Sequence, residues 1–153
     1  MPTSGIDILL VEDNPADIEL TLHVLRENRL ANPIHVVRDG EEALDYLFAS
    51  DANREQFFQH PPKLVLLDLK LPKIDGLEVL RAIKGDPRTK MIPVVVLTTS
   101  RQEKDLLESY DLGVNSYIQK PVDFGQFREV VSKLSLYWLL VNQPPPANAF
   151  LPK

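Results

Sequence analysis

Apolar and polar positions along the chain form two kinds of segment that follow one another. Short runs rich in Val, Ile and Leu have the length of buried strands. They lie at residues 6–11, 34–37, 63–68, 93–98 and 116–119. Between these runs, apolar residues recur at helical spacing, as Ile18, Leu22 and Leu25 do after Pro15. The last helical pattern is long, from about residue 123 to residue 141.

This alternation predicts an α/β fold. Five strand–helix units in succession favour a parallel sheet with helices on both faces. For five strands we expect the flavodoxin-like, doubly wound order 2-1-3-4-5 with five helices, and a site at the carboxyl ends of the strands. Residues 1–141 should form one domain, and residues 142–153 a Pro-rich tail. The connection at residues 49–62 is longer than such a unit needs.

Polar residues stand where four of the predicted strands end: Glu12, Asp13, Asp68, Thr98 and Lys120. In the expected strand order these ends are neighbours, so the side chains should share one pocket. Three close carboxylates repel one another, and one lysine cannot balance them. A divalent cation can, and oxygen ligands suit Mg²⁺. A carboxylate beside a hydroxyl, an ammonium and Mg²⁺ is suited to phosphoryl transfer in which the carboxylate attacks.

Each of these residues also has a purely structural interpretation. The run at residues 12–15 could cap the first helix, Asp68 could be a solvated strand end, and Lys120 could lie on the surface. Thr98 could be an ordinary strand residue. Asp75 is expected to be the N-cap of the third helix, with no chemical role. The coincidence of complementary types at four strand ends favours the functional interpretation.

Composition narrows the function classes. A net charge of −5 disfavours nucleic-acid binding, and the absence of cysteine excludes disulfides, thiol catalysis and Cys-ligated metals. No apolar run approaches the length of a membrane span, and the first residues lack the features of a signal peptide. We therefore expect a cytoplasmic protein without membrane contacts.

Four motifs carry a resemblance to a known family. VEDNP (11–15), LLDLKLPKIDG (66–76), PVVVLTTS (93–100) and SYIQKPVD (116–123) occur in the order typical of receiver domains of two-component response regulators. The resemblance covers about residues 6–140. The long 49–62 connection and the YWL sequence at 137–139 are similar to single-domain regulators of cyanobacterial and bacterial phytochromes. The partner implied is a sensor histidine kinase, which in that subfamily is a phytochrome.

The resemblance also implies a role for each residue at the strand ends. It makes Asp68 the phosphoacceptor. It implies that Mg²⁺ is held by Glu12, Asp13, Asp68 and the backbone carbonyl of Lys70.

The remaining implied roles concern stabilisation and switching. Thr98 and Lys120 would stabilise the phosphoryl group, and Thr98 with Tyr117 would form the switch. The Lys120–Pro121 peptide bond would be cis. Phosphorylation would then change the face made by the predicted helix near 106–110, the strand at 116–119 and the last helix.

The end of the last predicted helix is apolar on more than one face, which favours self-association. The expected dimer patch consists of Tyr137, Trp138, Val141 and Phe150. The alternative is that the tail folds back over its own helix.

Three functions are compatible with these residues. The first is a phosphorylatable response regulator, which is not a conventional enzyme; without an output domain after residue 141, it would act through protein contacts or a phosphorelay. The second is a pseudo-receiver that binds partners without phosphorylation, which the intact polar set disfavours. The third is a Mg²⁺-dependent phosphatase, whose second aspartate would stand at the position of Lys70.

Overall fold

The computed structural model describes residues 7–28, 33–48 and 61–146. Its sheet contains five parallel strands in the order β2-β1-β3-β4-β5. The strands are β1 (Ile8–Val11), β2 (Ile34–Val37), β3 (Leu64–Leu67), β4 (Val94–Thr98) and β5 (Ser116–Gln119). The helices are α1 (Pro15–Glu27), α2 (Gly40–Leu47), α4 (Gly76–Gly85), α5 (Glu103–Leu112), α6 (Phe124–Leu136) and the π-helix η1 (Tyr137–Val141). This confirms the predicted fold class and strand order.

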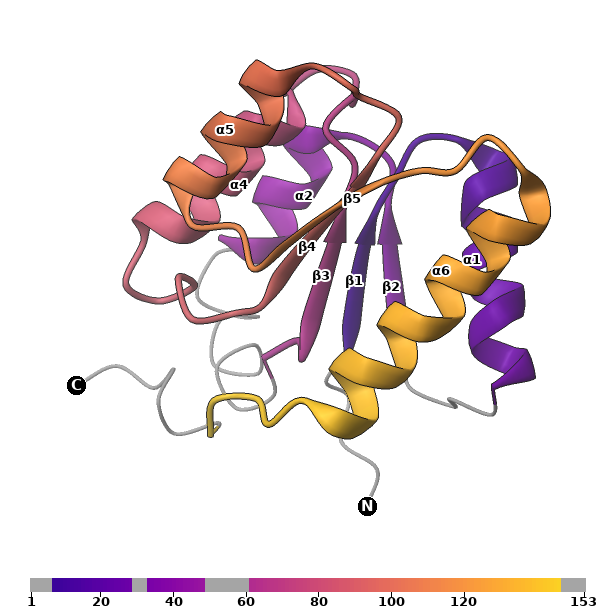
Figure 1. Ribbon diagram of the computed structural model, residues 1–153. Coiled ribbons are helices and arrows are strands. Elements are labelled where there is room, and N and C mark those ends of the chain that lie inside the picture. Colours follow the sequence, from indigo (N-terminus) through magenta and orange to yellow (C-terminus); the bar gives the residue numbers. More distant parts are fainter. Residues whose placement is uncertain (1–6, 29–32, 49–60, 147–153) are drawn as a thin grey trace.

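Helices cover both faces of the sheet (Figure 1). Helices α2, α4 and α5 lie on one side, and α1 and α6 pack together on the other. Two apolar cores follow from this arrangement, one on each face of the sheet. Every residue of β1, β3 and β4 is buried, whereas the edge strands β2 and β5 are mostly half-buried. Burial on both faces explains why the central strands are almost wholly apolar.

Local signals place the helix ends beside the carboxyl edge of the sheet. The Asn14 side chain caps α1 by accepting from Ala16 N and Asp17 N. Asp75 caps α4 by accepting from Leu77 N at 2.7 Å, as predicted. Gly76 follows it in a tight approach, because a Cβ there would lie 2.3 Å from the backbone oxygen of Asp68. The turn after β3 therefore needs a glycine.

The last helix differs from the prediction in type. Regular α-helix ends at Leu136, and η1 continues with wider turns, so that Asn142 N donates to Tyr137 O at 2.7 Å. This turn buries Leu139 and leaves Leu140 exposed. Of the predicted tail, residues 142–146 are described and are not helical. Residues 49–60 and Phe150 lie outside the described residues.

Candidate functional site

The carboxyl edge of the sheet brings the predicted acidic residues together. Glu12 and Asp13 follow β1, and Asp68 follows the neighbouring strand β3. One carboxylate oxygen of each lies within 4.8 Å of those of the other two. Glu12 and Asp68 are buried, whereas Asp13 is exposed. Three carboxylates converging with one open side are a donor set suited to a hard divalent cation, so the residues present fit the predicted metal.

Lys120 is the centre of the charge network. Its side chain is only 4% exposed, and its ammonium contacts three carboxylates. Nζ donates to Glu12 Oε1 at 2.6 Å, to Asp17 Oδ2 at 2.8 Å and to Asp68 Oδ2 at 3.2 Å. An ammonium has three N–H groups, and here each has a carboxylate partner. The structure thus places the Lys120 ammonium among the predicted acidic residues.

Asp17 was not predicted to belong to the site. It lies in the first turn of α1, where an acidic side chain is common for helix stability alone. The signal that could have found it is its place: α1 begins directly after Glu12 and Asp13, so its first turn must lie beside them. The Asp17 carboxylate is the fourth at this edge of the sheet.

The charges shift the protonation of the two most buried groups. Burial raises the pKa of the Glu12 carboxyl from 4.5 to about 7, and the negative charge of Asp68 acts in the same direction against the attraction of Lys120. Burial alone would lower the pKa of the Lys120 ammonium. The charge of Glu12 and the hydrogen bonds to Asp17 and Glu12 outweigh this, so its pKa lies above the ordinary value. Lys120 is therefore charged at neutral pH.

Two backbone N–H groups donate to side chains of the site. Lys70 N donates to Asp68 Oδ1 at 3.2 Å, and Ser100 N donates to Thr98 Oγ1 at 3.2 Å. Thr98 is fully buried at the end of β4, and Lys120 N donates to its backbone oxygen at 2.7 Å. The structure thus brings Thr98 and Lys120 to the edge that carries Asp68.

Tyr117 lies on β5 with its hydroxyl buried. Among the described residues, no hydrogen-bond partner of normal geometry meets this hydroxyl, although Ser100 lies close enough to lower the pKa of the phenol. Burial and the charges of Asp105 and Asp68 outweigh that effect and raise the pKa. The buried hydroxyl shows that the ring lies inward, where it packs against the core on one face of the sheet.

The prediction of a cis peptide bond before Pro121 is wrong for this structure. The described residues contain no cis peptide bond. An X–Pro bond favours trans by about 0.5–1 kcal/mol unless the surroundings demand otherwise. Here the trans bond already lets Lys120 donate through both its backbone and its ammonium.

The predicted dimer patch is only partly exposed. Tyr137 and Val141 are exposed, and Leu140, which was not predicted, is exposed beside them. Trp138 instead packs partly against the core between the sheet, α1 and α6, with its ring edge-to-face with Tyr137. Self-association itself stays a prediction.

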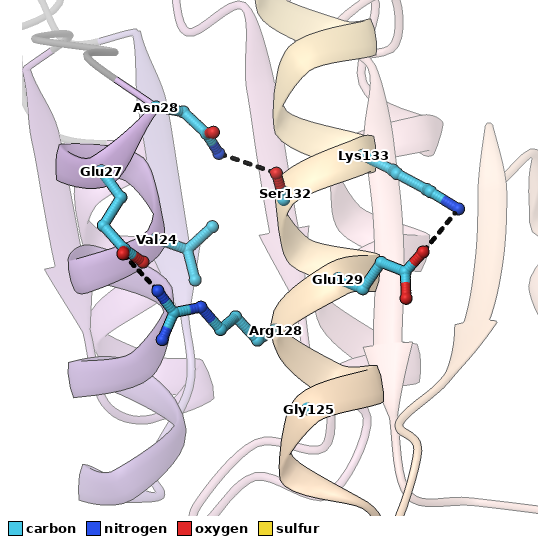
Figure 2. Close-up of a pocket in the computed structure, with 8 residues that line it drawn as sticks. All are labelled: Val24, Glu27, Asn28, Gly125, Arg128, Glu129, Ser132 and Lys133. Atoms are coloured by element: carbon cyan, nitrogen blue, oxygen red, sulfur yellow. Dashed lines mark hydrogen bonds and ion pairs between the residues drawn. The ribbon is translucent and has the colours of Figure 1, made fainter.

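A surface pocket of about 490 Å³ lies away from this site, between α1 and α6 (Figure 2). It is lined by Val24, Glu27, Asn28, Gly125, Arg128, Glu129, Ser132 and Lys133. The charged groups pair with one another: Arg128 with Glu27, and Lys133 with Glu129. Asn28 Nδ2 donates to Ser132 Oγ at 2.9 Å. The Arg128–Glu27 and Asn28–Ser132 contacts join the two helices, whereas the Lys133–Glu129 pair lies within α6. No charged group of the lining is left without a partner.

Comparison with known proteins assigns the family. The response regulator receiver domain family matches residues 8–132. The chain belongs to this family. It is 42% identical to the response regulator Rcp1 of Synechocystis over 86% of the chain and 88% of Rcp1. It is 44% identical to FilR2 of Methanothrix harundinacea, named a probable methanogenesis regulatory protein, over 90% of the chain and 86% of that protein.

Solved structures agree with this assignment. The crystal structure of the phosphorylated cyanobacterial phytochrome response regulator RcpA matches with a TM-score of 0.84 and 44% identity, over 94% of this chain and 100% of that one. The Mn²⁺-bound form of Rcp1 matches with a TM-score of 0.83 and 41% identity, over 91% of this chain and 98% of that one. Separately, none of the described helices is long and apolar enough to cross a membrane.

Proposed function

We propose that this receiver domain is a phosphorylation-dependent response regulator in which Asp68 accepts a phosphoryl group from a sensor histidine kinase. One observation carries the proposal: the carboxylates of Glu12, Asp13 and Asp68 lie within 4.8 Å of one another, and Lys120 reaches two of them. A module that only binds partners gains nothing from burying such a set, because close like charges destabilise the fold.

The chemistry follows from the atoms at this edge. A carboxylate oxygen of Asp68 attacks the phosphorus of a phosphohistidine, forming the O–P bond as the P–N bond breaks, and the imidazole leaves with the electron pair. When bound, Mg²⁺ neutralises charge on the transferred group, held by Glu12, Asp13, Asp68 and the backbone carbonyl of Lys70. Lys120 remains charged and pairs with a phosphoryl oxygen, exchanging its contact with Asp68 for this one.

The proposed switch uses Thr98 and Tyr117. The Thr98 hydroxyl already accepts from Ser100 N, so its own hydrogen is free to point at a phosphoryl oxygen. Within residues 7–28, 33–48 and 61–146 the buried Tyr117 hydroxyl has no hydrogen-bond partner of normal geometry, which makes the inward position of its ring easy to change. Movement of the two side chains would shift the population of the α5–β5–α6 face between two packings.

The cognate kinase is proposed to be a phytochrome because the chain resembles RcpA, a cyanobacterial phytochrome response regulator, over almost its whole length. The role is that of a phosphorylated signalling protein in the cytoplasm and not of an enzyme with a separate substrate, since the reacting carboxylate belongs to the protein itself.

We also propose that the chain forms a homodimer through η1. Tyr137 is 48% exposed and Val141 64% exposed, so both present apolar surface to a second copy. Sedimentation of the wild type and of Tyr137→Ser and Val141→Ser variants tests this. A concentration-dependent dimer that both variants weaken is expected, whereas a monomeric wild type, with or without a phosphoryl mimic, contradicts it.

Phosphorylation of Asp68 is tested with a small phosphodonor. Incubation with acetyl phosphate and Mg²⁺ should give an acid-stable, base-labile adduct that peptide mapping places on Asp68. The adduct should be absent with EDTA and in Asp68→Asn. Asp75→Asn is the matched control, because Asp75 lies in the same segment and only caps α4. An adduct that persists in Asp68→Asn, or no Mg²⁺-dependent adduct at all, rejects the proposal and favours the pseudo-receiver.

A further inference from the structure

Asp105 joins two loops that contact the candidate site. It lies in the first turn of α5 and is only 5% exposed. Its Oδ2 accepts from Ser100 Oγ at 2.5 Å, and the same oxygen lies 3.6 Å from Lys70 Nζ. Each of these partners also contacts the site through its backbone: Lys70 N donates to Asp68 Oδ1, and Ser100 N donates to Thr98 Oγ1.

We propose that Asp105 is a positioning residue that connects the phosphoacceptor and Thr98 to helix α5. The inference rests on the proposed function, because it concerns how phosphorylation of Asp68 reaches a surface. One buried oxygen of Asp105 contacts both the loop after β3, through Lys70, and the loop after β4, through Ser100. A displacement of either loop must therefore act on the first turn of α5.

The burial of Asp105 supports a role beyond solubility. A carboxylate loses favourable hydration when it is buried, and charge-assisted hydrogen bonds must offset this loss. The contact with Ser100 is short, and the first turn of a helix favours a negative charge. Asp111 offers the contrast, because it lies on the same helix, is exposed, and its side chain makes no hydrogen bond or ion pair with the described residues of either loop.

Phosphorylation of Asp68 changes the contacts that Lys70 and Ser100 make with Asp105. A phosphoryl group on Asp68 places new negative charge beside Lys70 and beside the hydroxyl of Thr98. Lys70 is then drawn away from Asp105, and Thr98 draws Ser100 with it through the 3.2 Å bond from Ser100 N. The Asp105 carboxylate transfers both changes to α5, whose Leu107 and Tyr110 present exposed apolar side chains.

Ser100 also lies beside the Tyr117 hydroxyl, which has no hydrogen-bond partner of normal geometry among the described residues. In this structure the Ser100 hydroxyl donates its hydrogen to Asp105 and accepts from Gln102 N at 3.3 Å. Release of Ser100 from Asp105 would leave that hydrogen available to the oxygen of Tyr117. Asp105 thereby holds the polar groups around Tyr117 in the arrangement of the unphosphorylated protein.

The test measures the response of α5 separately from phosphorylation. Backbone amide shifts of Leu107 and Tyr110 are followed by NMR in the wild type, Asp105→Asn, Ser100→Ala and the control Asp111→Asn, each before and after treatment with acetyl phosphate and Mg²⁺. Adduct formation on Asp68 is measured by mass in the same samples. In Asp105→Asn and Ser100→Ala we expect the adduct to form while the equilibrium between the two α5 states shifts about fivefold less than in the wild type. Asp111→Asn should respond as the wild type does.

The outcomes separate the two proposals. If the wild type forms no adduct on Asp68, the proposed function fails and the connection through Asp105 falls with it. If adducts form and α5 responds equally in all four proteins, the function stands and the role of Asp105 is overturned. If Asp105→Asn does not fold, Ser100→Ala decides, because it cuts the same link by removing one buried hydroxyl and leaves the Asp105 carboxylate in place. An unchanged α5 response in Ser100→Ala then overturns the proposal.

Discussion

Replacing Asp68 by Asn should stabilise the metal-free protein, although it removes the proposed phosphoacceptor. Asp68 is buried within 4.8 Å of carboxylate oxygens of Glu12 and Asp13. Its charge is one reason why the pKa of Glu12 is raised to about 7. The amide has nearly the same shape and keeps a carbonyl oxygen that can accept from Lys120. The substitution therefore removes repulsion while leaving the packing intact.

The size of the effect follows from the distances. At 4.8 Å, with an effective dielectric constant of about 20, the repulsion between Asp68 and Glu12 is at least about 3 kcal/mol. The attraction between Asp68 and Lys120 at 3.2 Å is about 5 kcal/mol on the same scale, but a hydrogen bond from the ammonium to the amide retains about 1.5–3 kcal/mol of it. The variant also avoids the repulsion between Asp68 and Asp13 and the free-energy cost of burying the Asp68 carboxylate. We expect a net gain of about 1–2 kcal/mol at pH 8.

Urea unfolding in EDTA at pH 8 and at pH 5 measures this gain for the wild type, Asp68→Asn and the control Asp75→Asn. At pH 5 Glu12 is mostly protonated, so the advantage of Asp68→Asn should disappear there. Added Mg²⁺ should stabilise the wild type more than Asp68→Asn, because it binds the folded acidic site. A destabilised Asp68→Asn at pH 8, or the same difference at both pH values, would refute the electrostatic reasoning.

Three further results are expected. The pKa of Glu12 is higher in the folded than in the unfolded chain, so its ionisation should lower the metal-free stability progressively from about pH 4.5 to about pH 7 and leave it level above. A Glu12→Gln variant, followed by urea unfolding at each pH, should lack this loss. Gly76→Ala should destabilise the folded protein by about 2 kcal/mol or more, because the new Cβ meets the backbone oxygen of Asp68. Gly85→Ala, whose Cβ has nothing within 4 Å, should be neutral or slightly stabilising. Thermal unfolding measures both. Asp17→Asn should weaken Mg²⁺ binding severalfold in calorimetry, because Lys120 loses one partner and competes more strongly for Glu12 and Asp68; an unchanged Kd would contradict this.

The strand ends were predictable from the sequence, but the contacts between distant side chains were not. Apolar runs of strand length and the helical spacing between them determine the parallel order, and that order brings residues 12, 68, 98 and 120 to one edge. The cap at Asp75 is a local signal of the same kind. Asp17 could not be found in this way, because its bond to Lys120 spans 103 positions and depends on how α1 sits on the sheet. The change from α to π winding at Tyr137 likewise depends on packing.

The bonding of Lys120 explains why the proposed phosphorylation would have to rearrange this site and could not simply add to it. All three N–H groups of the ammonium already point at carboxylates, so a phosphoryl oxygen can gain one only by displacement. The contact with Asp68, at 3.2 Å, is the longest of the three, and it is also the one that the proposed phosphorylation would weaken by converting the carboxylate to an acyl phosphate. Glu12 and Asp17 can then hold the ammonium in place during the exchange. The buried like charges that weaken the resting fold are thus the same groups that fix Lys120 where a phosphoryl oxygen would arrive.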